Sequence, residues 1–75
     1  MQSKDKIIFV KNGPPDRARL LNMFECFGRI EHLDIFRERR YAFITFSDRS
    51  SVELAISKLD GKVKYNRTLI VSRKL

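Results

Sequence analysis

The chain is organised around one stretch, Arg39-Arg40-Tyr41-Ala42-Phe43-Ile44-Thr45-Phe46. Its β-branched and aromatic residues predict a β-strand. Because successive side chains of a strand point to opposite faces, Tyr41 and Phe43 share one face. The other face carries Ala42, Ile44 and Phe46. A strand with one face on the core normally has a polar outer face. This strand is therefore either covered on both sides or keeps aromatic rings in solvent for a purpose.

Size and composition indicate one small globular domain. The chain has 75 residues, of which 43% are hydrophobic and 33% charged, and this length is near the lower limit for a core without disulfides or metal. No apolar run reaches membrane-spanning length, and the first residues lack the apolar segment of a signal peptide. We therefore expect a soluble, intracellular protein of the nucleus, the cytoplasm or both, with no membrane partner.

The chain has too few cysteine and histidine residues for an internal disulfide or a structural zinc site. The single Cys26 cannot form an internal disulfide, and it fits a reducing compartment. One Cys and one His are too few soft ligands for a structural zinc site. We expect no metal and no cofactor.

The charge balance favours a polyanionic partner. Sixteen Lys and Arg residues against nine Asp and Glu residues give a net charge of +7 and a pI near 10.1. Such a field attracts nucleic acid first and an anionic membrane second. The alternative is that the basic surface only keeps the domain soluble.

Four strands and two helices follow from the residue pattern. The strands are predicted over residues 7–10, 30–36, 41–46 and 68–73, and a polar connection over 62–66. The short connection 37–40 should join the second and third strands as an antiparallel hairpin. The helices have apolar residues at i, i+3, i+4 and i+7. These residues are Leu20, Met23, Phe24 and Phe27 in the first helix, and Val52, Ala55, Ile56 and Leu59 in the second.

The ends of both helices carry typical capping residues. Asp16 is the predicted N-cap of the first helix, and Gly28 should end it. At the start of the second helix Ser50 and Glu53 fit a capping box, and Gly61 should end this helix.

Two helices with one apolar stripe each cannot cover both faces of a four-stranded sheet. The economical arrangement is an α+β fold in the order β-α-β-β-α-β. It is a ferredoxin-like sandwich, with a four-stranded antiparallel sheet and both helices on one face. The covered face should carry Ile8, Val10, Leu33, Ile35, Ala42, Ile44, Phe46, Leu69 and Val71. The open face should carry Phe9, Tyr41 and Phe43, flanked by Phe36, His32 and Ile70.

The same stretch resembles a signature of the RNA recognition motif family. Residues 39–46 are similar to the family's octamer K/R-G-F/Y-G/A-F-V-x-F/Y, with Arg40 in place of the glycine. Residues 8–13 resemble the family's hexamer, with Gly13 in place of the usual leucine. Segments 20–30 and 55–61 also match the family's helices, and the resemblance covers about residues 6–74.

Three features depart from the family's usual pattern. The connection before the first helix is shorter than usual. The hairpin between the second and third strands is also short, which removes a loop that often clamps RNA. Asn66 stands where the family often has glycine, and asparagine tolerates the same left-handed backbone.

The resemblance implies an RNA-binding role for the aromatic residues. Phe9 and Tyr41 would each stack a base, and Phe43 would pack against bases or sugars. Such stacking contributes about 1–3 kcal/mol per base. Arg39 occupies the position where the family's basic residue usually meets a phosphate. The alternative reading of the residues is that these rings pack under a terminal extension or a partner protein.

Further charged residues border the predicted open face. Lys11, Arg73 and Lys74 lie at strand ends and are candidates for phosphate contacts, and for each of them a solvated surface charge is an equal alternative. Arg40 either adds a phosphate contact or only fills the tight hairpin. Asp34 would repel phosphate unless an arginine pairs with it, or it could accept a hydrogen bond from a base amino group.

Two functions remain after this reading. The first is a module that binds single-stranded RNA across the open face of the sheet. The second is a protein-interaction or dimerisation module of the same fold, which uses the sheet or the outer helix faces with Leu21 and Leu54. The chain shows no nucleophile motif and no carboxylate pair, so we expect neither an enzyme nor a small-molecule substrate. We expect residues 1–75 to be a single domain from a longer protein.

Overall fold

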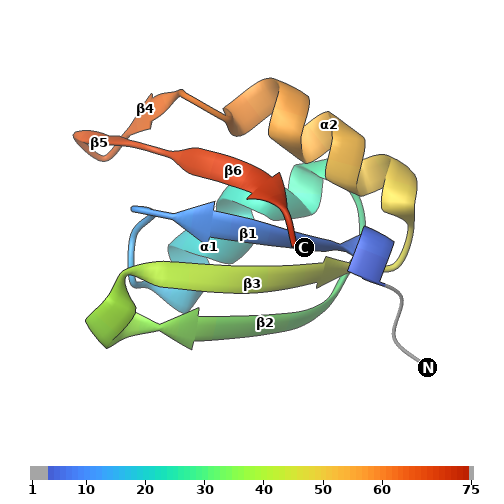
Figure 1. Ribbon diagram of the computed structural model, residues 1–75, viewed down its shortest axis with the longest axis horizontal. Helices are drawn as coiled ribbons and strands as arrows, with labels where there is room; N and C mark the ends of the chain where they lie inside the picture. The colour runs from blue at the N-terminus through green and yellow to red at the C-terminus, as the bar shows by residue number, and fades with distance from the viewer. Residues whose placement is uncertain (1–3, 75) are drawn as a thin grey trace.

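The computed structural model describes residues 4–74 and has the predicted β-α-β-β-α-β order (Figure 1). The four main strands are β1 (Ile7–Lys11), β2 (Ile30–Phe36), β3 (Tyr41–Phe46) and β6 (Ile70–Arg73), and the two α-helices are α1 (Arg17–Phe24) and α2 (Arg49–Leu59). Three short 3₁₀ turns, η1 (Lys4–Lys6), η2 (Glu25–Phe27) and η3 (Arg37–Arg39), complete these elements. The main strands form an antiparallel sheet in the order β2-β3-β1-β6. The predicted α+β fold class is confirmed.

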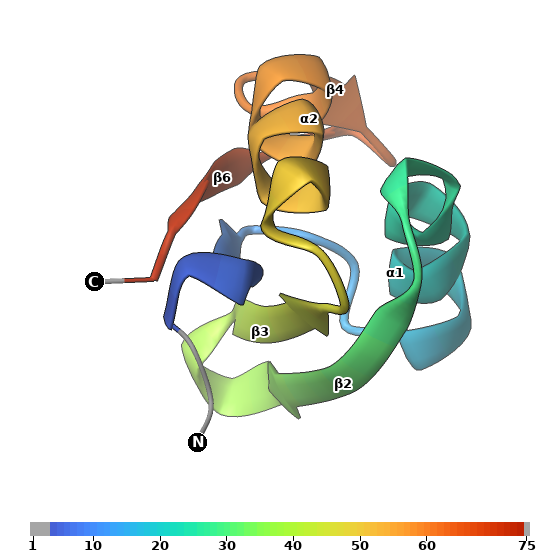
Figure 2. The same ribbon diagram turned by 90° about the vertical axis from the view of Figure 1, so that its right-hand side faces the viewer.

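Both helices lie on the same side of the sheet, as the edge-on view in Figure 2 shows. The core between them consists of the alternate strand residues predicted for the covered face, together with the helix stripes. Its buried members include Ile8, Val10, Leu20, Phe24, Leu33, Ala42, Ile44, Phe46, Val52, Ala55, Leu59, Leu69 and Val71. Ile35, from the outer strand β2, is only partly buried against this core. The opposite face of the sheet carries no helix (Figures 1 and 2).

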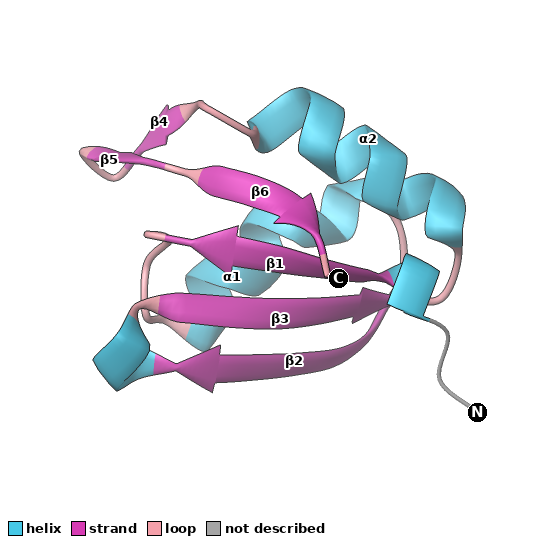
Figure 3. Ribbon diagram, in the orientation of Figure 1, coloured by secondary structure: helices cyan, strands magenta, loops and turns pink. Residues whose placement is uncertain are grey.

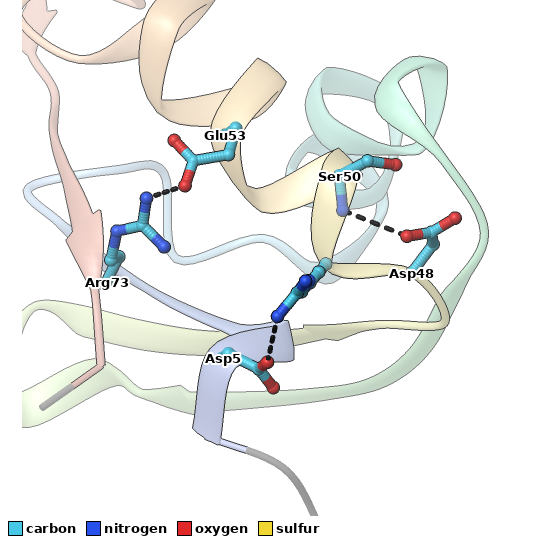
Figure 4. A network of polar contacts seen from close by, with 6 residues as sticks. Asp5, Asp48, Ser50, Glu53 and Arg73 are labelled. Atoms are coloured by element: carbon cyan, nitrogen blue, oxygen red, sulfur yellow. Dashed lines mark hydrogen bonds and ion pairs between the residues drawn. The ribbon is translucent and has the colours of Figure 1, made fainter.

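The N-cap of α2 differs from the one that the predicted capping box requires. Asp48, not Ser50, is the N-cap, and its Oδ1 accepts a hydrogen bond from the Ser50 backbone N–H at 3.0 Å (Figure 4). This hydrogen bond keeps the pKa of the Asp48 carboxyl below its ordinary value of 3.8. Ser50 therefore lies inside the first turn, and the expected capping box with Glu53 is wrong. At α1 the predicted N-cap Asp16 is confirmed, because its side chain accepts a hydrogen bond from the backbone N–H of Ala18.

The last predicted strand is interrupted, and an additional hairpin precedes it (Figure 3). Strands β4 (Val63–Lys64) and β5 (Arg67–Thr68) pair with each other and not with the main sheet. The two residues between them, Tyr65 and Asn66, both have positive φ angles, of 52° and 62°. Two such residues define the type I′ turn that suits a two-residue hairpin. The left-handed geometry expected at Asn66 is therefore present.

A bulge in β2 decides which of its side chains reach the open face. The pairing with β3 shifts between Ile30 and His32, so one residue of β2, Glu31, has no direct partner. Ile30 consequently packs against the core, and His32 faces the other way. The following alternation places Asp34 and Phe36 on the open face with His32.

Residues 4–74 contain neither a membrane-spanning helix nor a cluster of metal ligands. No helix in this part of the chain is long and apolar enough to cross a membrane. The same residues contain no group of three or more His, Cys, Asp and Glu side chains placed to hold a metal ion.

Gly28 is held at a close contact between the end of η2 and helix α2. Its φ of 156° and ψ of 174° lie in a region that is essentially restricted to glycine. A β-carbon at this position would collide with the side chain of Ser51, which is buried on α2. Gly61 has a φ of 79°, but a β-carbon there would meet open space.

We expect Gly28→Ala to lower the free energy of unfolding by more than about 2 kcal/mol, because backbone strain and overpacking act together. The matched variant Gly61→Ala should lose only about 1 kcal/mol, because it meets backbone strain alone. Urea denaturation followed by circular dichroism measures both values. Equal losses in the two variants would show that the contact between Gly28 and Ser51 is unimportant.

Candidate nucleic-acid interface

Four aromatic rings form a continuous cluster on the open face of the sheet. The rings of Phe9, Phe36, Tyr41 and Phe43 have five pairs of neighbouring centroids, at 5.1 to 6.0 Å. The strand register explains the cluster, because Phe9 pairs with Phe43 across β1 and β3, and Phe36 pairs with Tyr41 across β2 and β3. We call these four residues the aromatic cluster.

Phe36 was predicted only to flank the rings of this face. It is the most exposed of the four rings, at 43%, whereas Phe9, Tyr41 and Phe43 are half-buried by one another. Phe36 lies directly opposite Tyr41 across β2 and β3. Because alternation puts both residues on the open face, a hairpin register could have predicted this contact. The aromatic cluster therefore extends to the outer strand β2.

The open face is closed at one end by the chain itself. Ile7 and Thr45, which pair with each other across β1 and β3, are buried although they lie on this face. The backbone N–H of Lys74 donates to the Ile7 carbonyl at 3.1 Å, so the chain continues along β1 beyond β6. The accessible platform is thus the aromatic cluster, not the whole sheet.

Lys74 is a basic residue that lies over one ring of the aromatic cluster. Its Nζ lies 4.9 Å from the centroid of the Phe43 ring, a cation–π distance. Lys11 is exposed at the end of β1, where it pairs with Tyr41 on one side and Ile70 on the other. Both residues agree with the predicted border of the open face.

Arg73 does not lie at the predicted border of the open face. Its guanidinium forms an ion pair with the Glu53 carboxylate of α2, on the helix side (Figure 4). The reason is strand alternation, because Arg73 follows the buried Val71 by two residues and shares its face. The expectation that Arg73 borders the open face is therefore wrong.

The two arginines of the hairpin differ in their placement. Arg39 is exposed in η3, beside Phe36 in a shallow depression. Arg40 ends η3 in the left-handed conformation, with φ 61° and ψ 38°, and its carbonyl accepts from the Asn12 N–H at 2.9 Å. Arg40 lines a small pocket at the end of the sheet together with Pro14 and Pro15. It therefore lies beside the β1–α1 connection, in a pocket that Phe36 and Tyr41 also line.

A hydrogen bond between two side chains of β2 lies on the part of the open face that belongs to this strand. His32 Nε2 lies 3.1 Å from Asp34 Oδ1, and the two side chains are 58% and 51% exposed. Their partners across the strand pair are Thr45 and Phe43. An arginine was considered as a partner that would offset the charge of Asp34, and the residue that contacts it is His32, two positions earlier in the same strand.

The two leucines proposed for protein contact lie on different helices. Leu21 is half-buried against the core and lines a groove between α1 and β2. Leu54 is 43% exposed on α2 and does not line that groove. The structure does not join them into one surface at this groove.

The sequence match to a family model decides the identity of this fold. The model described as RNA recognition motif matches residues 8–70. The chain belongs to the RNA recognition motif family. This is a family of RNA-binding domains and not of enzymes.

Individual relatives support the same assignment. Over 52 residues the chain is 36% identical to a subunit of eukaryotic translation initiation factor 3 from Aspergillus oryzae, and this match covers 61% of the chain and only 18% of that protein. The Pes4 RRM3 structure has a TM-score of 0.85 at 29% identity and covers 93% of this chain and 92% of its own. The Nab3-RRM, solved in a study of cis element recognition of non-polyadenylated RNAs, has a TM-score of 0.82 at 23% identity, with 93% and 95% coverage. The last similarity shows the fold alone.

The left-handed conformation of Arg40 explains why the family prefers glycine there. A residue with a β-carbon in this conformation costs roughly 1–2 kcal/mol, although glycine is also more flexible in the unfolded chain. We expect Arg40→Gly to raise the free energy of unfolding by up to about 1 kcal/mol. Arg39→Gly, in the right-handed turn η3, should lower it by about 0.5–1 kcal/mol. Thermal and urea unfolding measure both, and destabilisation by Arg40→Gly would contradict the strain argument.

Proposed function

We propose that the RNA recognition motif of this chain binds single-stranded RNA by stacking bases on Phe9 and Tyr41, with Phe43 packing against bases or sugars. The aromatic cluster on the face without helices is the observation that supports this proposal. Every base has a π face, so half-exposed rings can stack bases of different sequence. Rings that served only the core would be expected on the other side of the sheet, where both helices pack.

The charges around the aromatic cluster favour RNA over a neutral partner. The chain carries a net charge of +7, and Lys74 and Lys11 stand at the border of the rings. Arg39 lies at the β2 side of the same cluster. We assign these three residues to phosphate contacts. Arg40 and Arg73 are less suited, because one lies at the end of the sheet and the other is paired with Glu53.

Truncation of the stacking rings tests this proposal directly. Phe9→Ala and Tyr41→Ala should each weaken RNA binding about tenfold to a hundredfold, because each loses a stacking contact of about 1–3 kcal/mol. Fluorescence anisotropy with a labelled pool of short randomised RNAs measures the affinity, and circular dichroism confirms the fold. The control is Leu54→Ala, which removes an exposed apolar side chain from α2. Unchanged affinity in both ring variants would refute stacking on this face.

The salt dependence of binding separates phosphate contacts from remote charges. Each phosphate neutralised on a single strand contributes about −0.7 to the slope of log affinity against log salt. Lys11→Gln and Lys74→Gln should therefore each reduce the magnitude of this slope by about 0.7. Arg73→Gln removes the same charge on the helix side and should leave the slope nearly unchanged. An equal change in Arg73→Gln would place Arg73 on the RNA path, against this assignment.

Protein binding on the helix side is the second candidate function. A groove of about 470 Å³ lies between the ends of α1 and α2 and the β4–β5 hairpin. Val63 and Tyr65, which line this groove, are 67% and 50% exposed. Size-exclusion chromatography with light scattering distinguishes the two functions: a stable dimer without any response to RNA would favour this one.

The biological setting is part of the same proposal. The chain covers only 18% of the initiation-factor protein that it resembles. We therefore propose that residues 1–75 are one domain of a longer protein, in which other modules add affinity. Such a protein would act on RNA in the nucleus or the cytoplasm, and the similarity to an initiation factor favours the cytoplasm.

A further inference from the structure

Asp34 is a negative charge on the outer strand β2, at the edge of a surface otherwise suited to RNA. Among the open-face residues of the four main strands, within the described part of the chain, it is the only one with a carboxylate. A carboxylate repels the phosphate backbone, and so it weakens RNA binding wherever it makes no compensating contact. Its presence beside the aromatic cluster therefore calls for such a contact.

The register of β2 and β3 places Asp34 at the edge of one stacking ring. Asp34 is directly opposite Phe43, and β-carbons of directly opposed residues are about 5 Å apart. Its side chain is 51% exposed, so the carboxylate is accessible beside the ring. Lys74 Nζ lies 4.9 Å from the centre of the same ring. A base that packed against Phe43 would take the place of Lys74 on this ring, and it would have the carboxylate of Asp34 on the neighbouring strand within reach.

His32 occupies one oxygen of this carboxylate and leaves the other available. The hydrogen bond at 3.1 Å joins His32 Nε2 to Asp34 Oδ1. Over the described residues Asp34 has no other hydrogen bond or ion pair. With Oδ1 held by His32, Oδ2 remains as an acceptor for a donor on a ligand. His32 is in this sense a positioning residue.

We propose that Asp34 selects the base that packs against Phe43, preferring an exocyclic amino group over a carbonyl group. Cytosine and adenine each present an amino group, which donates a hydrogen bond to a carboxylate oxygen. Uracil presents the carbonyl oxygen O4 at the corresponding position, and two acceptors facing each other repel. The preferred ligand is therefore single-stranded RNA with cytosine or adenine at this position. This inference rests on the proposed RNA-binding function.

The difference between cytosine and uracil provides a sharp test. Anisotropy titrations with labelled octamers of cytidine and of uridine give two affinities for each protein. The wild-type chain should bind the cytidine octamer about tenfold more tightly, the effect of one charged hydrogen bond of about 1.4 kcal/mol. Asp34→Ala should bring this ratio close to one by weakening the binding of cytidine.

A second variant controls for the change in net charge. Glu38 is an exposed carboxylate in the β2–β3 hairpin, next to the same surface. Glu38→Ala removes the same charge as Asp34→Ala, and it should raise both affinities equally and preserve the ratio. The effect of Glu38→Ala on the affinity for the uridine octamer gives the increase in affinity that results from the loss of one negative charge alone.

The outcomes separate this inference from the function on which it rests. A lost preference for cytidine in Asp34→Ala, with the ratio preserved in Glu38→Ala, supports base selection by Asp34. Equal gains for both octamers in Asp34→Ala, or a wild-type chain that prefers uridine, would overturn base selection and leave RNA binding intact. Failure of the wild-type chain to bind either octamer would overturn the proposed function itself.

Discussion

The amount of apolar helix surface is the constraint on which the rest of this structure depends. A sheet of four strands has two faces, and helices α1 and α2 each bury one stripe. Burial of apolar area is the main stabilising term of such a small domain, so both stripes pack on the same face and form one core. The other face is left without an α-helix, and the rings of the aromatic cluster on it stay partly exposed to solvent. The aromatic cluster is a direct result of this arrangement.

Strand alternation then decides which charges can act together. Lys11 shares its face with Phe9, and Lys74 reaches the ring of Phe43. Arg73 shares its face with Val71 and pairs with Glu53 instead. Lys74 can therefore contact a ligand on the rings, whereas its neighbour Arg73 joins β6 to α2. For this reason net charge alone does not define a binding surface.

The hairpin between β2 and β3 limits how the aromatic cluster can be approached. Its four residues form one tight turn that ends in the left-handed Arg40, whose carbonyl is tied to Asn12. Such a turn is too short to fold over the rings. A ligand is therefore held by the rings and by side chains at their border, among them Lys74 and the pair of His32 and Asp34.

The sequence by itself determined the order of the elements, the α+β class and the two faces of the sheet. These properties depend on periodic patterns among residues that are close in the chain. Examples are the alternation over residues 41–46 and the apolar helix stripes that begin at Leu20 and Val52. The rings Phe9, Tyr41 and Phe43 were assigned to the open face on the same grounds, and they lie there.

Only the tertiary structure decided the features that depend on contacts between distant segments. The ion pair of Arg73 with Glu53 and the position of Lys74 over Phe43 each join separate elements, and the bulge in β2 depends on the pairing of this strand with β3. The type I′ turn at Tyr65 was not predicted either, because a residue with this side chain rarely adopts a positive φ. Alternation gives the face on which a side chain lies, but its partner depends on register, bulges and the path of the chain ends. These are set by how the whole sheet packs against its helices.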